Sequence, residues 1–208
     1  MSRPIVIIRH GCTALNKTDS SGDKIRGWKD VPLNEIGRKE ATKLGERLKG
    51  AGPDYLVASD LIRAKETAVI ISKISGIPLE LVTKSFRPWD VGKYAGTSSQ
   101  ESVPILTEMA EKQPGKKVPG GEAFNTFKAR LFGGLYNLLR ANDEIPGIVT
   151  HHRVERLLKA WQAAGYPKNG DIDPRVFAQK GESTGHLEVF GVPVERIPHD
   201  AFSDYGWA

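Results

Sequence analysis

The stretch Ile5-Val6-Ile7-Ile8-Arg9-His10-Gly11 joins an apolar run to an Arg-His-Gly tripeptide. Four consecutive aliphatic residues that end at a charge predict a short buried strand, with Arg9 and His10 directly after it. An arginine offers a fixed, positively charged fork to phosphate oxygens, and a glycine lets the backbone approach a ligand closely. This stretch therefore predicts a strand followed by an anion-binding turn in which His10 is placed to react.

Strand-like and helix-like segments alternate through the rest of the chain. We expect strands over residues 5–8, 55–58, 80–82, 147–150 and 186–190. We expect helices over residues 34–49, 62–74, 103–112, 122–141 and 153–164. The alternation predicts an α/β fold with a mostly parallel central sheet and helices on both faces. The 208 residues are expected to form one domain, and the Gly-, Pro-, Ser- and charge-rich segment 86–117 is expected to be an insertion that covers the site.

Basic side chains follow three of the predicted strands. Arg9 and His10 come after the first strand, Arg63 after the second, and His151 and His152 after the strand over 147–150. In open α/β sheets, ligands bind outside the carboxyl ends of the strands. The sequence therefore predicts that these side chains meet in one site.

The residue types at this edge are suited to phosphoryl transfer, which needs a nucleophile, cationic groups for the phosphoryl oxygens and an acid for the leaving oxygen. His10 can be the nucleophile if one ring nitrogen is unprotonated. Arg9 and Arg63 can bind the phosphate, His151 can stabilise the charge of the transferring group, and Asn16 can donate a neutral hydrogen bond. We expect no metal and no other cofactor, because these side chains already supply positive charge and no zinc-type histidine spacing is present.

Composition limits the partners. Hydrophobic residues are 39% and charged residues 26% of the chain, which is typical of a soluble globular protein. No apolar stretch reaches membrane-spanning length, and the apolar run near the N-terminus is too short for a secretory signal, so we expect no membrane contact and a cytoplasmic location. The single cysteine, Cys12, agrees with a reducing compartment.

The net charge of +5 favours anionic partners. Because the basic residues are scattered, we expect a small phosphorylated metabolite or a phosphorylated side chain rather than nucleic acid.

Several short motifs together resemble the histidine phosphatase superfamily, also called the phosphoglycerate mutase-like superfamily. In chain order they are Arg9-His10-Gly11 with Thr13 and Asn16, Arg26-Gly27-Trp28 with Asp30 and Pro32-Leu33, Ser59-Asp60-Leu61 with Arg63, Phe86-Arg87 with Gly92, Pro119-Gly120-Gly121-Glu122, and Val149-Thr150-His151. The resemblance spans almost the whole chain. It implies a three-layer α/β/α sandwich, a phosphohistidine intermediate on His10, a pocket of Arg9, Arg63, His151 and Asn16, and a metal-independent reaction.

Two positions depart from the superfamily pattern. The superfamily usually has a glutamate, the general acid, directly after the residue that matches Arg87, and this chain has Pro88 there. Asp90 lies two positions later and is our candidate for the acid, although an aspartate beside Gly92 is also typical of a turn. His152 stands where the superfamily often has glycine, and we expect it to contact the substrate.

These observations predict a phosphatase that hydrolyses phosphomonoesters, with His10, Asp90 and His151 as catalytic residues. Arg9, Asn16, Arg63 and His152 are the predicted substrate-binding residues. One alternative is a phosphoglycerate mutase that needs no metal, and another, suggested by Pro88, is a weakly active or non-catalytic phosphoryl-binding protein. The sequence leaves the substrate open among sugar phosphates, nucleotides, phosphohistidine on a protein and phosphoglycerates, and it leaves the oligomeric state open.

Overall fold

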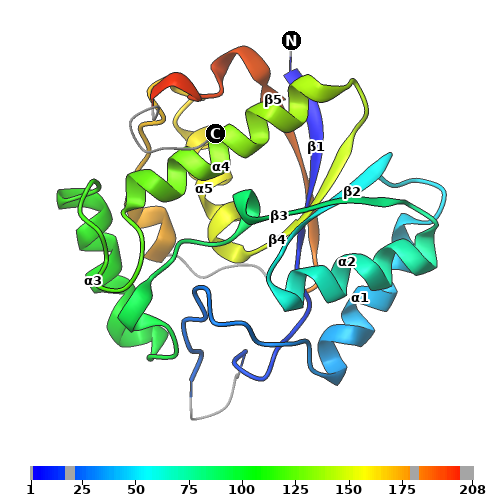
Figure 1. The fold of residues 1–208 in the computed structure, drawn as a ribbon, viewed down its shortest axis with the longest axis horizontal. Helices are drawn as coiled ribbons and strands as arrows, with labels where there is room; N and C mark the ends of the chain where they lie inside the picture. The colour runs from blue at the N-terminus through cyan, green and yellow to red at the C-terminus, as the bar shows by residue number, and fades with distance from the viewer. Residues whose placement is uncertain (1, 17–21, 179–182, 202–208) are drawn as a thin grey trace.

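The computed structural model describes residues 2–16, 22–178 and 183–201 (Figure 1). Within these ranges the chain forms one five-stranded sheet with the strand order β3-β2-β4-β1-β5. The four strands from β1 to β4 pair in parallel, and β5 pairs antiparallel with β1 at the edge of the sheet. The predicted α/β fold with a mostly parallel sheet is confirmed.

The bounds of the elements are close to those predicted from the sequence. The strands are β1 (Ser2–Arg9), β2 (Tyr55–Ser59), β3 (Leu79–Thr83), β4 (Pro146–Thr150) and β5 (Leu187–Pro193). The α-helices are α1 (Glu35–Leu48), α2 (Ile62–Ser75), α3 (Ser99–Lys112), α4 (Phe124–Ala141) and α5 (His152–Ala163). Short 3-10 helices are η1 (Lys84–Phe86), η2 (Gly92–Tyr94), η3 (Pro174–Ala178) and η4 (Val194–Arg196). None of the helices within the described ranges combines the length and the apolar character needed to cross a bilayer.

The two faces of the sheet pack into separate cores. Ile5, Ile7 and Ile148 face a cluster that includes apolar residues of α3, α4 and α5. Val6 and Ile8, which alternate with them along β1, face a second cluster that includes residues of α1 and α2. Because successive side chains of a strand point to opposite faces, the continuous apolar run at residues 5–8 buries both faces at once. The result is the three-layer α/β/α sandwich, with α1 and α2 side by side on one face (Figure 1).

Two elements begin three or four residues earlier than their apolar patterns predicted. Helix α3 begins at Ser99 rather than near residue 103. This first turn was not predicted, because it is polar and carries no apolar repeat. Strand β1 begins at Ser2, since the antiparallel pairing with β5 extends the ladder to Ser2 opposite Pro193. The pairing partner, rather than hydrophobicity, determines where this strand begins.

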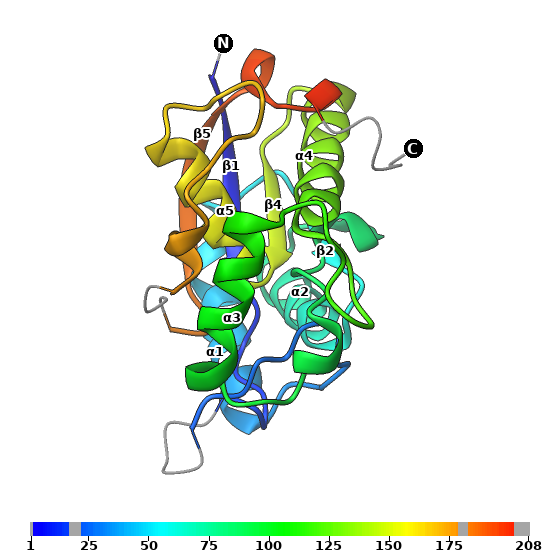
Figure 2. The same cartoon turned by 90° about the vertical axis from the view of Figure 1, so that its left-hand side faces the viewer.

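The register of the sheet brings the predicted site together. Arg9, the last residue of β1, pairs with Thr150, the last residue of β4, and Ala58 of β2 pairs with Val149. The residues that follow β1, β4 and β2 therefore meet at one edge. In Figures 1 and 2 the segment 22–34 lies at this end of the molecule, next to the residues that lead into α3. They touch there, because Ile25 N–H donates to Thr97 O at 3.0 Å.

Candidate active site

His10 follows β1 and is held in one tautomer. Its Nδ1 lies 2.7 Å from the carbonyl oxygen of Gly11, and a carbonyl only accepts, so Nδ1 carries the proton. Burial, the main cause, and the positive charge of Arg63 hold the pKa of His10 well below its ordinary value, although the Gly11 hydrogen bond acts in the opposite direction. His10 is therefore neutral at pH 7, and its Nε2 has a free lone pair, as a nucleophile requires.

His151 follows β4 and faces His10. The centroids of the two rings are 5.1 Å apart. His151 Nε2 lies 2.8 Å from Ser59 Oγ, and that oxygen also accepts the N–H of Leu61 at 3.5 Å, which leaves the serine proton for the histidine. Burial, followed by the charge of Arg63, lowers the pKa of His151 well below its usual range. In this arrangement the one proton of a neutral His151 is on Nδ1, where it can be donated to a phosphoryl oxygen.

Arg63 lies in the first turn of α2 with its guanidinium in a fixed position. Its Nη1 donates to Lys29 O at 2.9 Å and its Nη2 to Gly27 O at 3.0 Å. These acceptors carry no net charge, and burial, followed by the charge of Arg26, lowers the pKa of Arg63 to about 9, so it is still a cation at pH 7. Within the described ranges, Arg63 Nε and His151 Nδ1 are buried and have no hydrogen-bond partner. Because a buried donor without a partner is costly, these two nitrogens are open positions for an anionic ligand.

The turn after His10 is fixed by close backbone packing. A Cβ on Gly11 would lie 2.4 Å from Gly37 O, and a Cβ on Gly37 would lie 2.1 Å from Cys12 O, so both positions require glycine. Gly11 N–H donates to Thr67 Oγ1 at 3.1 Å, and this hydroxyl donates to Arg63 O at 2.7 Å. Thr67 thus joins the loop that carries His10 to the helix that carries Arg63.

The remaining predicted binding residues adjoin the two histidines along the chain, with Arg9 before His10, Asn16 in the loop after it and His152 after His151. Arg9 is 7% exposed, and burial, the main cause, together with the charge of Arg26 lowers its pKa to about 10. Asn16 Oδ1 accepts the N–H and the hydroxyl of Thr13 at 3.0 and 2.8 Å, so its amide Nδ2 is the end that can donate to a ligand. His152 Nε2 accepts from Arg156 Nε at 2.9 Å, and burial, followed by the charge of Arg9, lowers the pKa of His152 to about 3.

This geometry agrees with the comparison to known families. The sequence model of the histidine phosphatase superfamily (branch 1) matches residues 5–172. The chain belongs to the histidine phosphatase superfamily. The resemblance read from the motifs is therefore confirmed, and the superfamily acts in general through a phosphohistidine.

Relatives of this superfamily member are named both as phosphatases and as mutases. An uncharacterized phosphatase, PhoE of Bacillus subtilis, is 30% identical over 71% of this chain and 70% of the relative. A protein named "Probable phosphoglycerate mutase GpmB" of Cronobacter sakazakii is 28% identical over 63% of this chain and 60% of the relative. The structure of a mycobacterial glucosyl-3-phosphoglycerate phosphatase with VO3 is similar with a TM-score of 0.69 and 25% identity, over 90% of this chain and 92% of the other.

The loop that departs from the superfamily pattern is tightly bonded. Pro88 has no proton to give, and its carbonyl accepts from Arg130 Nη2 at 3.1 Å. Asp90 Oδ1 accepts the N–H of Gly92 at 3.1 Å, and the N–H of Asp90 donates to Glu122 Oε1 at 2.9 Å. The second oxygen of the Asp90 carboxyl is the one that could carry a proton to a leaving group.

Sequence reasoning missed the residues that hold the site in place. Ser59, Thr67 and the carbonyls of Gly27 and Lys29 all orient a reactive side chain, yet no role was predicted for them. Ser59 and Thr67 are completely buried, although both have polar side chains. The available signal was their position, because Ser59 is the last residue of β2 and Thr67 lies one helical turn after Arg63.

A cluster behind the site has the residue types of a metal centre. Glu155, His186 and Glu188 place possible ligand atoms within 4.8 Å of one another. The ammonium of Lys159 already lies 2.9 Å from Glu155 Oε1 and 2.7 Å from Glu188 Oε2. Because a lysine takes the position of the cation between these two carboxylates, the residues present do not fit a metal ion well.

Proposed function

We propose that this protein hydrolyses phosphomonoesters through a phosphohistidine on His10. The observation that carries the proposal is the state of the two facing histidines. His10 presents an unprotonated Nε2, while His151 and Arg63 each have a buried nitrogen without a partner. A phosphoryl group bonded to His10 would bring oxygens to those nitrogens.

In the first step, His10 Nε2 forms a bond to phosphorus as the bond between phosphorus and the ester oxygen breaks. Arg9 and Arg63 bind the phosphoryl oxygens, and His151 Nδ1–H donates to one of them. Because these groups are fixed before the reaction, they stabilise the developing charge without having to reorganise. Asn16 and His152 complete the proposed substrate-binding set.

The leaving oxygen takes a proton as it departs, and we assign that proton to Asp90. In the second step, water attacks phosphorus, the bond to His10 Nε2 breaks, and Asp90 takes a proton from the water, so that inorganic phosphate leaves and His10 is regenerated. The assignment needs the free oxygen of Asp90 to turn toward the ester. We expect Asp90→Asn to lower the rate most for esters of alkyl alcohols, whose leaving oxygens need a proton, and least for p-nitrophenyl phosphate.

The test is the release of inorganic phosphate by wild-type protein and by His10→Ala. We expect wild-type turnover of p-nitrophenyl phosphate and no turnover above background by the variant. Full activity of a folded His10→Ala protein would refute the mechanism. Interconversion of 2- and 3-phosphoglycerate, assayed in parallel, tests the mutase alternative, and faster interconversion than hydrolysis would favour it. Binding of vanadate with no turnover of any ester would favour a non-catalytic member.

A further inference from the structure

Arg26 lies between two parts of the proposed active site. Its Nη1 donates to Asp23 Oδ1 at 2.9 Å and lies 3.4 Å from the carbonyl oxygen of Leu15, in the turn after His10. The carbonyl of the next residue, Gly27, accepts from Arg63 Nη2 at 3.0 Å. The backbone of Arg26 thus adjoins the arginine of the phosphate pocket, and its guanidinium reaches the loop that carries the nucleophile.

The charge of Arg26 acts on the whole site. Four side chains share this electrostatic neighbour. They are Arg9, His10, Arg63 and His151. For each of them burial is the main cause of a lowered pKa, and the positive charge of Arg26 adds to it. Together with the contacts of Leu15 O and Gly27 O, these shifts agree with a position of Arg26 beside the proposed phosphate pocket.

Arg153 brings a further positive charge to the same region. It is in the first turn of α5, two residues after His151, and its guanidinium carbon lies 5.9 Å from the centroid of the Trp89 ring. Burial, followed by the charge of Arg26, lowers its pKa to about 10, so it is still a cation at pH 7.

The positive charges of these arginines exceed the negative charge of the phosphoryl group that reacts. A phosphomonoester carries about two negative charges at pH 7, and Arg9 and Arg63 already match them. Two other arginines of this region have nearby carboxylates, because Arg87 binds Asp60 at 2.6 Å and Arg130 binds Glu122 at 2.7 Å.

The partner of Arg26, by contrast, faces the solvent. The side chain of Asp23 is 49% exposed and that of Arg26 is 12% exposed, whereas Arg63 is 1% exposed. Exposed ion pairs are weak, so an anionic ligand can compete with Asp23 for this guanidinium. Arg26 is thus a cation on the solvent side of the buried phosphate pocket.

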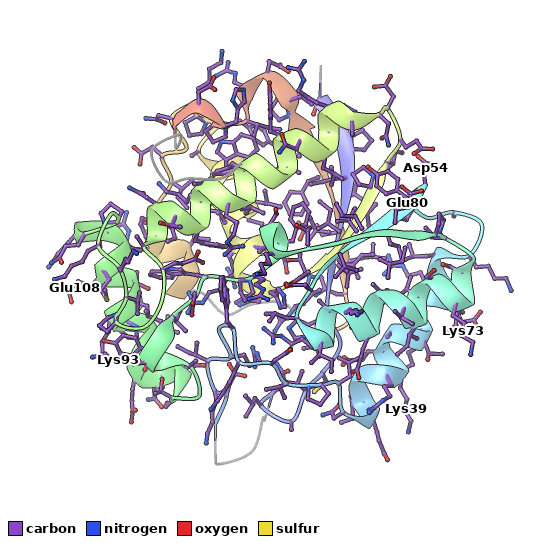
Figure 3. The ribbon with its side chains drawn as sticks, viewed as in Figure 1. Lys39, Asp54, Lys73, Glu80, Lys93 and Glu108 are labelled. Atoms are coloured by element: carbon purple, nitrogen blue, oxygen red, sulfur yellow. The ribbon has the colours of Figure 1, made fainter. Side chains whose placement is uncertain are left out.

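We propose that Arg26 binds a second anionic group of the substrate, a carboxylate or a second phosphate, a few bonds away from the transferring phosphoryl group. The proposal rests on the proposed phosphatase function and narrows its substrate class. Small phosphomonoesters with a second negative charge are the preferred substrates, and esters of neutral alcohols are poorer ones. Lys39, Lys73 and Lys93, by contrast, are exposed and lie at the periphery of the molecule (Figure 3). Their charges are surrounded by solvent rather than placed at the proposed pocket.

The test compares substrates that differ only in the second charge. The carboxylate arm pairs 3-phosphoglycerate with glycerol 3-phosphate, in which a hydroxymethyl group replaces the carboxylate. The phosphate arm pairs the phosphate ester of 2-hydroxyethylphosphonate, whose C–P bond is not hydrolysed, with the phosphate monoester of 1,3-propanediol, in which a hydroxymethyl group replaces the phosphonate. For each pair, the ratio of kcat/KM values for phosphate release is measured in wild-type protein and in Arg26→Gln. We expect wild type to favour the doubly anionic member of at least one pair. In that pair Arg26→Gln should lower the ratio about tenfold or more, because one charge-assisted hydrogen bond is lost.

A matched control removes the same charge elsewhere. Arg47 is exposed in the last turn of α1, and Arg47→Gln should leave both ratios at their wild-type values. Arg26→Lys, which keeps the charge, should retain part of the preference. Equal losses for both members of each pair in a folded Arg26→Gln protein would overturn the proposal, because Arg26 would then serve the reacting phosphate itself. If wild type releases no phosphate from any ester, the proposed function fails, and the same ratios are measured as Kd values by calorimetry. A wild-type Kd ratio near one would then overturn this proposal too.

Discussion

Replacing Ser59 by alanine isolates the hydrogen bond that orients His151. Ser59 Oγ lies 2.8 Å from His151 Nε2, and the serine is completely buried at the end of β2. In wild type the hydroxyl proton satisfies Nε2 and places the proton of His151 on Nδ1, toward the phosphoryl group. In Ser59→Ala the bond is lost, Nε2 is left buried, and the tautomer with the proton on Nδ1 loses its advantage.

The size of the effect follows from the cost of that unpaired nitrogen. Leaving a buried polar group without its partner costs about 1–3 kcal/mol. Because about 1.4 kcal/mol corresponds to a factor of ten in rate, kcat/KM should fall about 5- to 150-fold. The same substitution removes only one oxygen from the protein, so we expect Tm to fall by no more than several degrees.

The assay is the initial rate of phosphate release over a range of substrate concentrations, with a thermal melt to check the fold. The matched control is Ser75→Ala, which removes a hydroxyl bonded to Ile71 O at 2.8 Å near the end of α2, away from the site. Its kcat/KM should equal that of wild type. A Ser59→Ala protein with kcat/KM within a factor of two of wild type would refute the assignment of the His151 tautomer.

Three further predictions follow from the packing and charge of the site. Gly37→Ala should lower the free energy of unfolding in urea by about 3 kcal/mol or more, because the new Cβ would lie 2.1 Å from Cys12 O. An unchanged unfolding midpoint would contradict this packing. The free energy of unfolding should fall as the pH drops below about 6.5, which is the pKa of a histidine in the unfolded chain. The pKa of His152 is lowered to about 3 in the folded state, so protonation favours the unfolded state, and this residue alone should cost about 2 kcal/mol between pH 6.5 and pH 5. His152→Asn should remove that part of the loss, and equal pH dependence in both proteins would argue against it. Prolonged dialysis against EDTA should leave the turnover of p-nitrophenyl phosphate unchanged, whereas a loss restored by a divalent cation would disprove the prediction that no metal is needed.

The sequence was sufficient to predict the five strands and, to within one residue, the carboxyl ends of the four parallel ones. The apolar run at residues 5–8 predicts a strand buried on both faces, and the structure places it between the two cores. The same alternation put His10 and His151 directly after two predicted strands, and the structure pairs those strands in parallel, with the two rings 5.1 Å apart. This worked because the carboxyl ends of parallel strands reach the same edge of a sheet in whatever order the strands pair.

The contacts that hold the reactive groups were beyond the reach of pattern and spacing. Arg63 is fixed by the carbonyls of Gly27 and Lys29, more than 30 positions earlier in the chain. A backbone carbonyl has no sequence signature, because every residue has one. The proposed role of Arg26 was not predicted for a related reason. Its position relative to the two histidines depends on how the segment 22–34 folds over the sheet edge. Such long-range contacts follow from tertiary packing and not from local propensity.

The most direct test of the mechanism is to identify the atom to which phosphorus is bonded during turnover. Wild-type protein is mixed with a substrate labelled in its phosphoryl group, quenched within the first turnover and denatured at alkaline pH, where phosphohistidine survives. The phosphorylated site is then identified by mass spectrometry and phosphorus NMR. The account predicts one labelled residue, His10, with phosphorus on Nε2, because Nδ1 donates to Gly11 O. Label on another residue, label on His10 Nδ1, or rapid hydrolysis with no covalent label would contradict it.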